Sequence, residues 1–166
     1  ISCVLQRAGI YSGTIRENIA MGKPGASDEE IMEAAEAAQM ADYIKAQPDG
    51  LEHRLEQAGK NLSGGQKQRV SIARAILKNA PIYLFDDSFS ALDCMTEAKL
   101  RRALAEKAAG RTQIVVTQRV TSAMNSDRIF VMDGGRLVGA GTHNELLEHC
   151  EVYREIYLSQ TGGERR

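Results

Sequence analysis

The sequence has 166 residues, the size of about one domain, and this length excludes a self-contained membrane transporter. Apolar residues make up 43% and charged residues 26%, a mixture that is typical of a globular protein with a real core and argues against disorder. Lys and Arg total 21 against 22 Asp and Glu, so the net charge of -1 offers no general attraction to nucleic acid or to an anionic membrane. Any phosphate that the protein binds must therefore be held by local geometry.

The cysteines, the apolar runs and the start of the sequence indicate the cellular environment of the protein and whether the sequence is a fragment. Cys3, Cys94 and Cys150 are odd in number and lack C-x-x-C spacing, which indicates a reducing, cytosolic environment. No run approaches the roughly 18 apolar residues of a membrane span, and no cleavable leader pattern is present. The sequence opens at Ile1 within an apolar run, so we expect it to be a fragment of a longer protein.

The first half of the sequence predicts a short strand followed by helices. Residues 1–5 are apolar and β-branched, which favours a buried strand that ends at the polar Gln6. Thr14 and Ser27 are each followed three residues later by Glu, the pattern of a capped helix start. We expect a mostly helical subdomain over about residues 10–80.

The segment Leu62-Ser63-Gly64-Gly65-Gln66 is the strongest chemical signal. Ser63 and Gln66 have the spacing of a capping box, and the two glycines remove side chains from the approach to the helix start. Exposed N–H groups and the helix dipole together form an anion site. An ordinary helix cap in a loop is the alternative interpretation, and the segment alone does not separate the two.

A second signal follows an almost wholly apolar run at residues 81–85. Such a run predicts a strand buried on both faces of a parallel sheet. Asp86 and Asp87 come at its end, where α/β folds bind ligands, and Asp93 follows in Ser-Ala-Leu-Asp. As an alternative, the first two residues end the strand in a turn and Asp93 caps a helix; the cap role is compatible with a ligand role.

The remainder of the sequence completes a βαβ unit and adds a hairpin. An apolar stripe from Leu100 to Ala108 predicts a helix, and residues 113–117 predict a second buried strand. Asp133-Gly134-Gly135 predicts a hairpin turn, and Thr142 begins a C-terminal helical segment. We expect residues 81–160 to form part of the core and residues 161–166 to form a disordered tail.

In this order and spacing, the motifs resemble the nucleotide-binding domain of ATP-binding-cassette (ABC) proteins over nearly the whole chain. Gln6 resembles the Q-loop glutamine, Leu62 to Gln66 the signature motif, Asp86 the Walker B aspartate and Asp93 the D-loop aspartate. The resemblance implies an α/β fold of the P-loop NTPase type, with a parallel sheet core, a helical signature subdomain and a C-terminal β-hairpin. It further implies ATP bound at these residues, and Mg²⁺ held by Asp86 and Gln6.

Segments 11–19 and 139–146 resemble the exporter subgroup, whose nucleotide-binding domain follows a transmembrane domain in the same chain. The expected location is then the cytoplasmic face of the cell membrane. The basic stripe of a nucleic-acid-binding protein is missing from the sequence, so we expect no nucleic-acid partner.

Three features depart from the family pattern: one missing motif and two substituted residues. The G-x-x-x-x-G-K-[ST] motif of the phosphate-binding loop is absent, so we expect these 166 residues alone to bind ATP poorly or not at all and to be inactive. Asp87 stands where the family has its catalytic glutamate, and its side chain is one methylene shorter. Gln118 stands where the family has its switch histidine, and an amide cannot carry a positive charge. A smaller departure, Gln57-Ala58-Gly59 in place of Glu-Arg-Gly, affects the expected contact with the membrane domain.

Together, Asp87 and Gln118 predict a site that binds ATP and hydrolyses it slowly, which resembles one half of a heterodimeric ABC exporter. In that family two domains sandwich two ATP molecules, so the intact signature motif would complete the catalytic site of the partner subunit. Two alternatives stay open: a soluble ABC ATPase of DNA repair or translation, and an inactive truncated product.

Overall fold

The computed structural model describes residues 1–162, and its chain forms two compact units, Ile1–Val116 and Thr117–Arg166. Each unit has a hydrophobic core of its own. Within residues 1–162, no helix combines the length and the apolar character that a membrane crossing requires. All three cysteines are free, and only Cys150 is buried.

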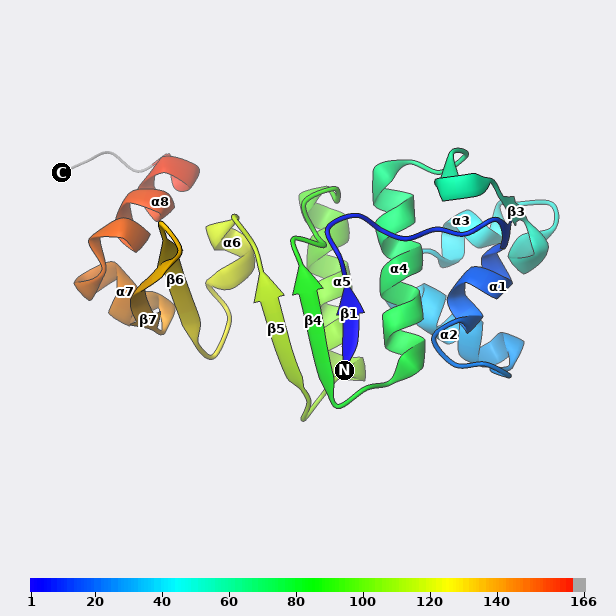
Figure 1. Ribbon diagram of the computed structural model, residues 1–166, viewed down its shortest axis with the longest axis horizontal. Helices are drawn as coiled ribbons and strands as arrows, with labels where there is room; N and C mark the ends of the chain where they lie inside the picture. The colour runs from blue at the N-terminus through cyan, green and yellow to red at the C-terminus, as the bar shows by residue number, and fades with distance from the viewer. Residues whose placement is uncertain (163–166) are drawn as a thin grey trace. The chain divides into compact units, whose positions relative to one another are not determined.

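A three-stranded parallel sheet forms the centre of the first unit (Figure 1). Its strands lie in the order β1 (Ser2–Val4), β4 (Ile82–Asp86), β5 (Thr112–Val116). Helix α5 (Cys94–Lys107) connects β4 to the parallel β5, so the predicted βαβ unit is confirmed. Because β1 and β4 are parallel, Gln6 and Asp87 both follow the carboxyl ends of their strands.

The segment between β1 and β4 is mostly helical, as predicted. It contains α1 (Ile15–Ala20), α2 (Asp28–Ala37), α3 (Ala41–Lys45) and α4 (Gly64–Lys78). Between them lie the 3₁₀ turns Gly50–Glu52 and Gln57–Gly59 and a two-stranded ribbon of β2 (Gly13–Thr14) and β3 (Arg54–Leu55). Helices α1, α2 and α4 begin with complete capping boxes at Thr14, Ser27 and Ser63, which confirms these predicted helix starts.

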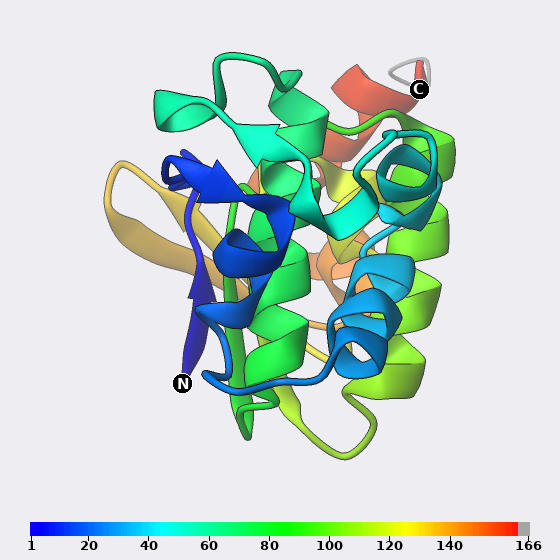
Figure 2. The same cartoon turned by 90° about the vertical axis from the view of Figure 1, so that its right-hand side faces the viewer.

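Helix α4 is the central helix of this unit. Figure 2 shows α4 between strands β1 and β4 on one side and helices α2 and α5 on the other. Eight of its side chains are buried, among them Val70, Ile72 and Ala73. Since α4 begins at the Ser63 cap, the core holds the predicted anion site in a fixed position.

The burial of the strands differs from the prediction. In β4, Tyr83 and Phe85 are buried, but Ile82 and Leu84 are only half-buried. In β5, Ile114 and Val116 are about half exposed, at 50% and 51%, so the prediction of a buried strand is wrong for β5. The reason is that the helices of this unit pack on one face of the sheet, while these side chains point to the other face.

The second unit contains the predicted hairpin. Strands β6 (Ile129–Asp133) and β7 (Arg136–Gly141) pair antiparallel, and Gly134 and Gly135 both have positive φ, at 51° and 76°. Three helices accompany the hairpin: α6 (Val120–Ala123), α7 (His143–His149) and α8 (Glu151–Thr161). Helix α7 begins after Thr142, as predicted, and Thr142 forms a complete capping box with Glu145. Thr161, the first residue of the predicted tail, is the last residue of α8, while residues 163–166 lie outside the described residues.

The predicted boundary near residue 80 does not coincide with the division after Val116. Strand β4 and helix α5 share a hydrophobic core with α2 and α4, so the helical segment and the sheet form one unit.

Candidate functional site

The carboxyl ends of β1 and β4 bring Gln6 and Asp87 together. The Gln6 Nε2 atom donates a hydrogen bond to Asp87 Oδ2 at 3.3 Å, and Asp86 is the last residue of β4. Asp87 itself has a positive φ of 46°, a conformation that Asp tolerates better than most side chains. Its backbone N–H donates to the carbonyl of Val116 at 2.9 Å, which fixes the turn against β5. The Asp87 carboxylate therefore has a defined place and a defined partner.

The signature segment forms the first turn of α4. The Ser63 hydroxyl accepts a hydrogen bond from the Gln66 N–H at 3.2 Å, and the Gln66 side chain accepts one from the Ser63 N–H at 2.7 Å. Leu62 is buried, with 6% of its surface exposed, and anchors the turn in the core. Gly64 is exposed, and N–H groups in the first turn of a helix have no partner within the helix. The helix thus presents backbone donors beside its positive dipole end, which suits a phosphate.

The loop that contains Asp93 packs against this turn. A Cβ atom placed on Gly65 would lie 3.1 Å from the carbonyl oxygen of Ala91, so glycine permits the close approach. Asp93 caps α5 by accepting a hydrogen bond from the Thr96 N–H at 2.9 Å, as predicted, and hydrogen bonding from Thr96 lowers the pKa of Asp93. Burial lowers the pKa of the nearby Arg69 guanidinium, and the charge of Asp93 partly offsets this effect.

Gln118 belongs to the second unit, whereas the other predicted site residues belong to the first. Its side chain is exposed, and its backbone carbonyl accepts a hydrogen bond from Gln160 Nε2 at 2.7 Å. The same Gln160 side chain accepts a hydrogen bond from the Val120 N–H at 2.9 Å. Helix α8 therefore fixes the backbone around Gln118 and leaves its amide exposed.

The donor set at the strand ends fits a magnesium ion. Asp86 supplies a carboxylate and Gln6 an amide oxygen, and Mg²⁺ in nucleotide sites takes one or two protein oxygens while phosphates and water complete its shell. Among residues 1–162, no three or more His, Cys, Asp or Glu side chains gather into a metal cluster. A magnesium ion held by these two side chains would take its other ligands from phosphate oxygens and water.

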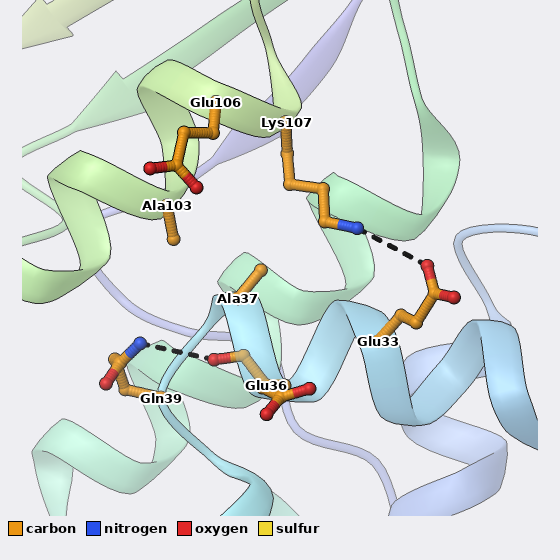
Figure 3. Close-up of a pocket in the computed structure, with 7 residues that line it drawn as sticks. All are labelled: Glu33, Glu36, Ala37, Gln39, Ala103, Glu106 and Lys107. Carbon is orange, nitrogen blue, oxygen red and sulfur yellow. Dashed lines mark hydrogen bonds and ion pairs between the residues drawn. The ribbon is translucent and has the colours of Figure 1, made fainter.

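A separate pocket of about 250 Å³ lies between α2 and α5 (Figure 3). Glu33, Glu36, Glu106 and Lys107 are among its lining residues, and Figure 3 shows Lys107 directed toward Glu33. The pair is 3.3 Å apart and largely exposed, so it contributes little to stability. None of the predicted site residues lines this pocket.

Two polar residues of α4 make long-range hydrogen bonds that the sequence did not predict. Gln68 is 3% exposed, and its Nε2 atom donates to the carbonyl of Gln6 at 2.6 Å. Arg74 donates to the carbonyls of Asn18 and Gly9 at 2.7 and 2.9 Å. The available signal was that Gln68 stands at i, i+4 spacing with the buried Ile72, so a polar side chain interrupts an apolar stripe.

The fold and the site define a nucleotide-binding protein with a signature-type helix start and a carboxylate at the end of a parallel strand. The family model for ABC transporters matches residues 1–90, and the chain belongs to this family.

Known proteins agree with this assignment. The chain is 49% identical over 164 residues to an uncharacterized ABC transporter ATP-binding protein, YfiB, of Bacillus subtilis, matching 99% of this chain and 28% of that protein. It is 44% identical over 160 residues to an ATP-dependent lipid A-core flippase of Chromobacterium violaceum, matching 96% of this chain and 27% of that protein. The structure of a bacterial Atm1-family ABC exporter with ATP bound superimposes with a TM-score of 0.93 at 41% identity, covering 96% of this chain and 28% of that chain.

The predicted fold class is thereby confirmed: the chain has the α/β fold of an ABC ATPase. It spans about 28% of the length of the relatives that it matches. Members of this family bind ATP.

Proposed function

We propose that the chain is part of the ATP-binding and ATP-hydrolysing module of an ABC exporter, with a degenerate site of its own and an intact signature for a partner subunit. The observation that carries the proposal lies in the first unit, where a complete signature start at Ser63 occurs together with Asp87 in the place of the catalytic glutamate. The relatives named as an exporter and a flippase support the transport class.

The signature turn is suited to bind the γ-phosphate of an ATP held by the partner. Gly64 is exposed, and the capping box holds the first turn of α4 in place, so its N–H donors are positioned before the nucleotide arrives. Such preorganised donors stabilise charge that develops on a phosphate during transfer. In this role the chain assists hydrolysis at the partner's site through Ser63, Gly64, Gly65 and Gln66.

The chain's own site is suited to hold ATP more than to hydrolyse it. Asp86 and Gln6 would hold Mg²⁺, which bridges phosphate oxygens and neutralises their charge when bound. Asp87 would orient the attacking water as general base, but its carboxylate reaches one methylene less far than that of glutamate. A misplacement of about 1 Å can lower the rate roughly a hundredfold. Gln118, as an amide, would donate a hydrogen bond without adding positive charge.

The proposed assembly contains a transmembrane domain in the same full-length chain and a second, non-identical ABC subunit, at the cytoplasmic face of the membrane. The small share of each relative that the chain covers leaves room for such a domain. The pairing with a non-identical subunit follows from the asymmetry between an intact signature and a shortened general base.

The test uses the full-length exporter assembled with its partner, in which the partner's own catalytic glutamate is replaced by Gln. The remaining ATP turnover then comes from the site of this chain. Asp87→Glu should raise it by about tenfold to a hundredfold, because the longer side chain restores the reach of the base. Asp87→Asn is the matched control and should remove the residual turnover. If the site with Asp87 already turns over ATP as fast as the unmodified exporter, it is not degenerate.

A further inference from the structure

Gln68 is a buried polar residue whose presence packing alone does not explain. Only 3% of it is exposed, and its Nε2 atom donates to the backbone carbonyls of Gln6 at 2.6 Å and Leu5 at 3.3 Å. Its Oε1 atom is buried and has no hydrogen-bond partner among the described residues. An unsatisfied buried acceptor destabilises a fold relative to an apolar side chain of the same size. The two donated hydrogen bonds at best offset this cost, so stability alone does not account for a glutamine at this position.

The backbone that Gln68 holds carries a functional side chain. Gln6 follows the last residue of β1 by two positions, and its exposed amide donates to Asp87 Oδ2 at 3.3 Å. The direction of that side chain depends on the backbone from which it extends. Bonds to two successive carbonyls, Leu5 and Gln6, fix this backbone against α4. Residues that orient a ligand in this way affect metal affinity without touching the metal.

We propose that Gln68 is a positioning residue of the nucleotide site: from the signature helix it fixes the backbone of Gln6, so that the Gln6 amide is directed toward Asp87 and Mg²⁺. This inference rests on the proposed function, since it places Gln6 and Asp87 at a Mg²⁺–nucleotide site. Helix α4 then supports two structures at once, because its first turn faces the partner's nucleotide and its second turn holds Gln6.

The test compares Gln68→Leu with Gln47→Leu in the full-length exporter assembled with its partner. The leucine at position 68 keeps the approximate size while removing both the amide donor and the unsatisfied acceptor. Gln47 is a matched control, because its Nε2 atom likewise donates to a backbone carbonyl, that of Tyr43 at 3.2 Å. Three quantities are measured: Mn²⁺ affinity by electron paramagnetic resonance with a non-hydrolysable ATP analogue, hydrogen exchange of residues 5–9 without nucleotide, and the melting temperature.

Gln68→Leu should weaken one of the exporter's two Mn²⁺ sites about tenfold and accelerate exchange at residues 5–9. Its melting temperature should change little, because the lost bonds to the Leu5 and Gln6 carbonyls are offset by removal of the buried, unsatisfied acceptor. Gln47→Leu should leave the Mn²⁺ affinity unchanged. The inference is overturned if Gln68→Leu binds Mn²⁺ like the wild type. It is also overturned if the loss of affinity is matched by a lower melting temperature and by faster exchange throughout the first unit, since Gln68 would then be structural only. A wild-type exporter that binds no Mn²⁺–nucleotide would instead refute the proposed function together with this inference.

Discussion

Gly64 offers a way to separate the stability of the signature helix from its function. It is the first residue of α4, and a Cβ atom placed on it would lie 3.9 Å from its nearest neighbour, the Cβ atom of Ala91. This is an ordinary van der Waals distance, and the φ of Gly64 is not positive. Replacing Gly by Ala at a compatible position stabilises a protein by about 0.4 to 1 kcal/mol, because the unfolded chain loses freedom. For a protein of this size that corresponds to a melting temperature higher by about 1 to 4 °C.

In the proposed function, the same methyl group would stand where the phosphate approaches the first turn of α4. A displacement of the nucleotide by about 1 Å lowers the rate by about a hundredfold. Gly64→Ala in the full-length exporter should therefore melt at or above the wild-type temperature while ATP turnover at the partner's site falls by about that factor. Thermal denaturation and steady-state ATP hydrolysis measure the two effects.

Gly65→Ala is a less selective change, since its Cβ atom would lie 3.1 Å from the Ala91 carbonyl oxygen and the neighbouring loop would have to move. It should lower stability and turnover together. Wild-type turnover in Gly64→Ala would refute the assignment of the signature turn to a phosphate site, and a clearly lower melting temperature would refute the packing argument.

Three further predictions concern stability. Arg74→Met removes the hydrogen bond to the Asn18 carbonyl at 2.7 Å and should lower the free energy of unfolding by about 1.5 to 3 kcal/mol in urea denaturation; an unchanged midpoint would contradict this. Hydrogen bonding from Thr96 lowers the pKa of Asp93 in the folded state. The ionised Asp93 therefore stabilises the fold at pH values above about 3.9, the ordinary pKa of Asp, and this stabilisation is lost as the pH falls through the lowered pKa. Asp93→Asn keeps a helix cap without the titration, and its melting temperature should decline less than that of the wild type between pH 5 and pH 3; parallel curves would count against the argument. Ala58 has a left-handed backbone conformation with φ of 57°, which is strained for alanine. Ala58→Gly should remove this strain and raise the free energy of unfolding in urea by about 1 kcal/mol at most. A decrease would show that Ala58 is unstrained.

Local features of the fold were predictable from the sequence, because a capping box needs only four residues. The starts at Thr14, Ser27, Ser63 and Thr142 all occur as predicted. The exposure of β5 was not predictable, since an apolar run such as residues 113–117 does not indicate whether helices cover one face of a sheet or both.

In the candidate site, too, local features could be predicted and contacts between distant segments could not. The cap at Asp93 and the capping box at Ser63 could be derived from their own neighbours in the sequence. The approach of Gln6 to Asp87 depends on the parallel pairing of β1 with β4, which connects residues far apart in the chain. Gln68 could not be assigned, because its bond to Gln6 exists only after α4 has packed beside β1.

In the proposed function, this chain supplies the signature of an active site in its partner, while its own site contributes little turnover. The most direct measurement is the steady-state ATP hydrolysis of the full-length pair with Ser63→Ala or Asp87→Asn in this chain. Ser63→Ala should lower the rate about a hundredfold, because loss of the capping box lets the N–H donors of the first turn shift by about 1 Å, while Asp87→Asn should retain most of the rate. A rate that collapses with Asp87→Asn and survives Ser63→Ala would contradict this division of roles between the two sites.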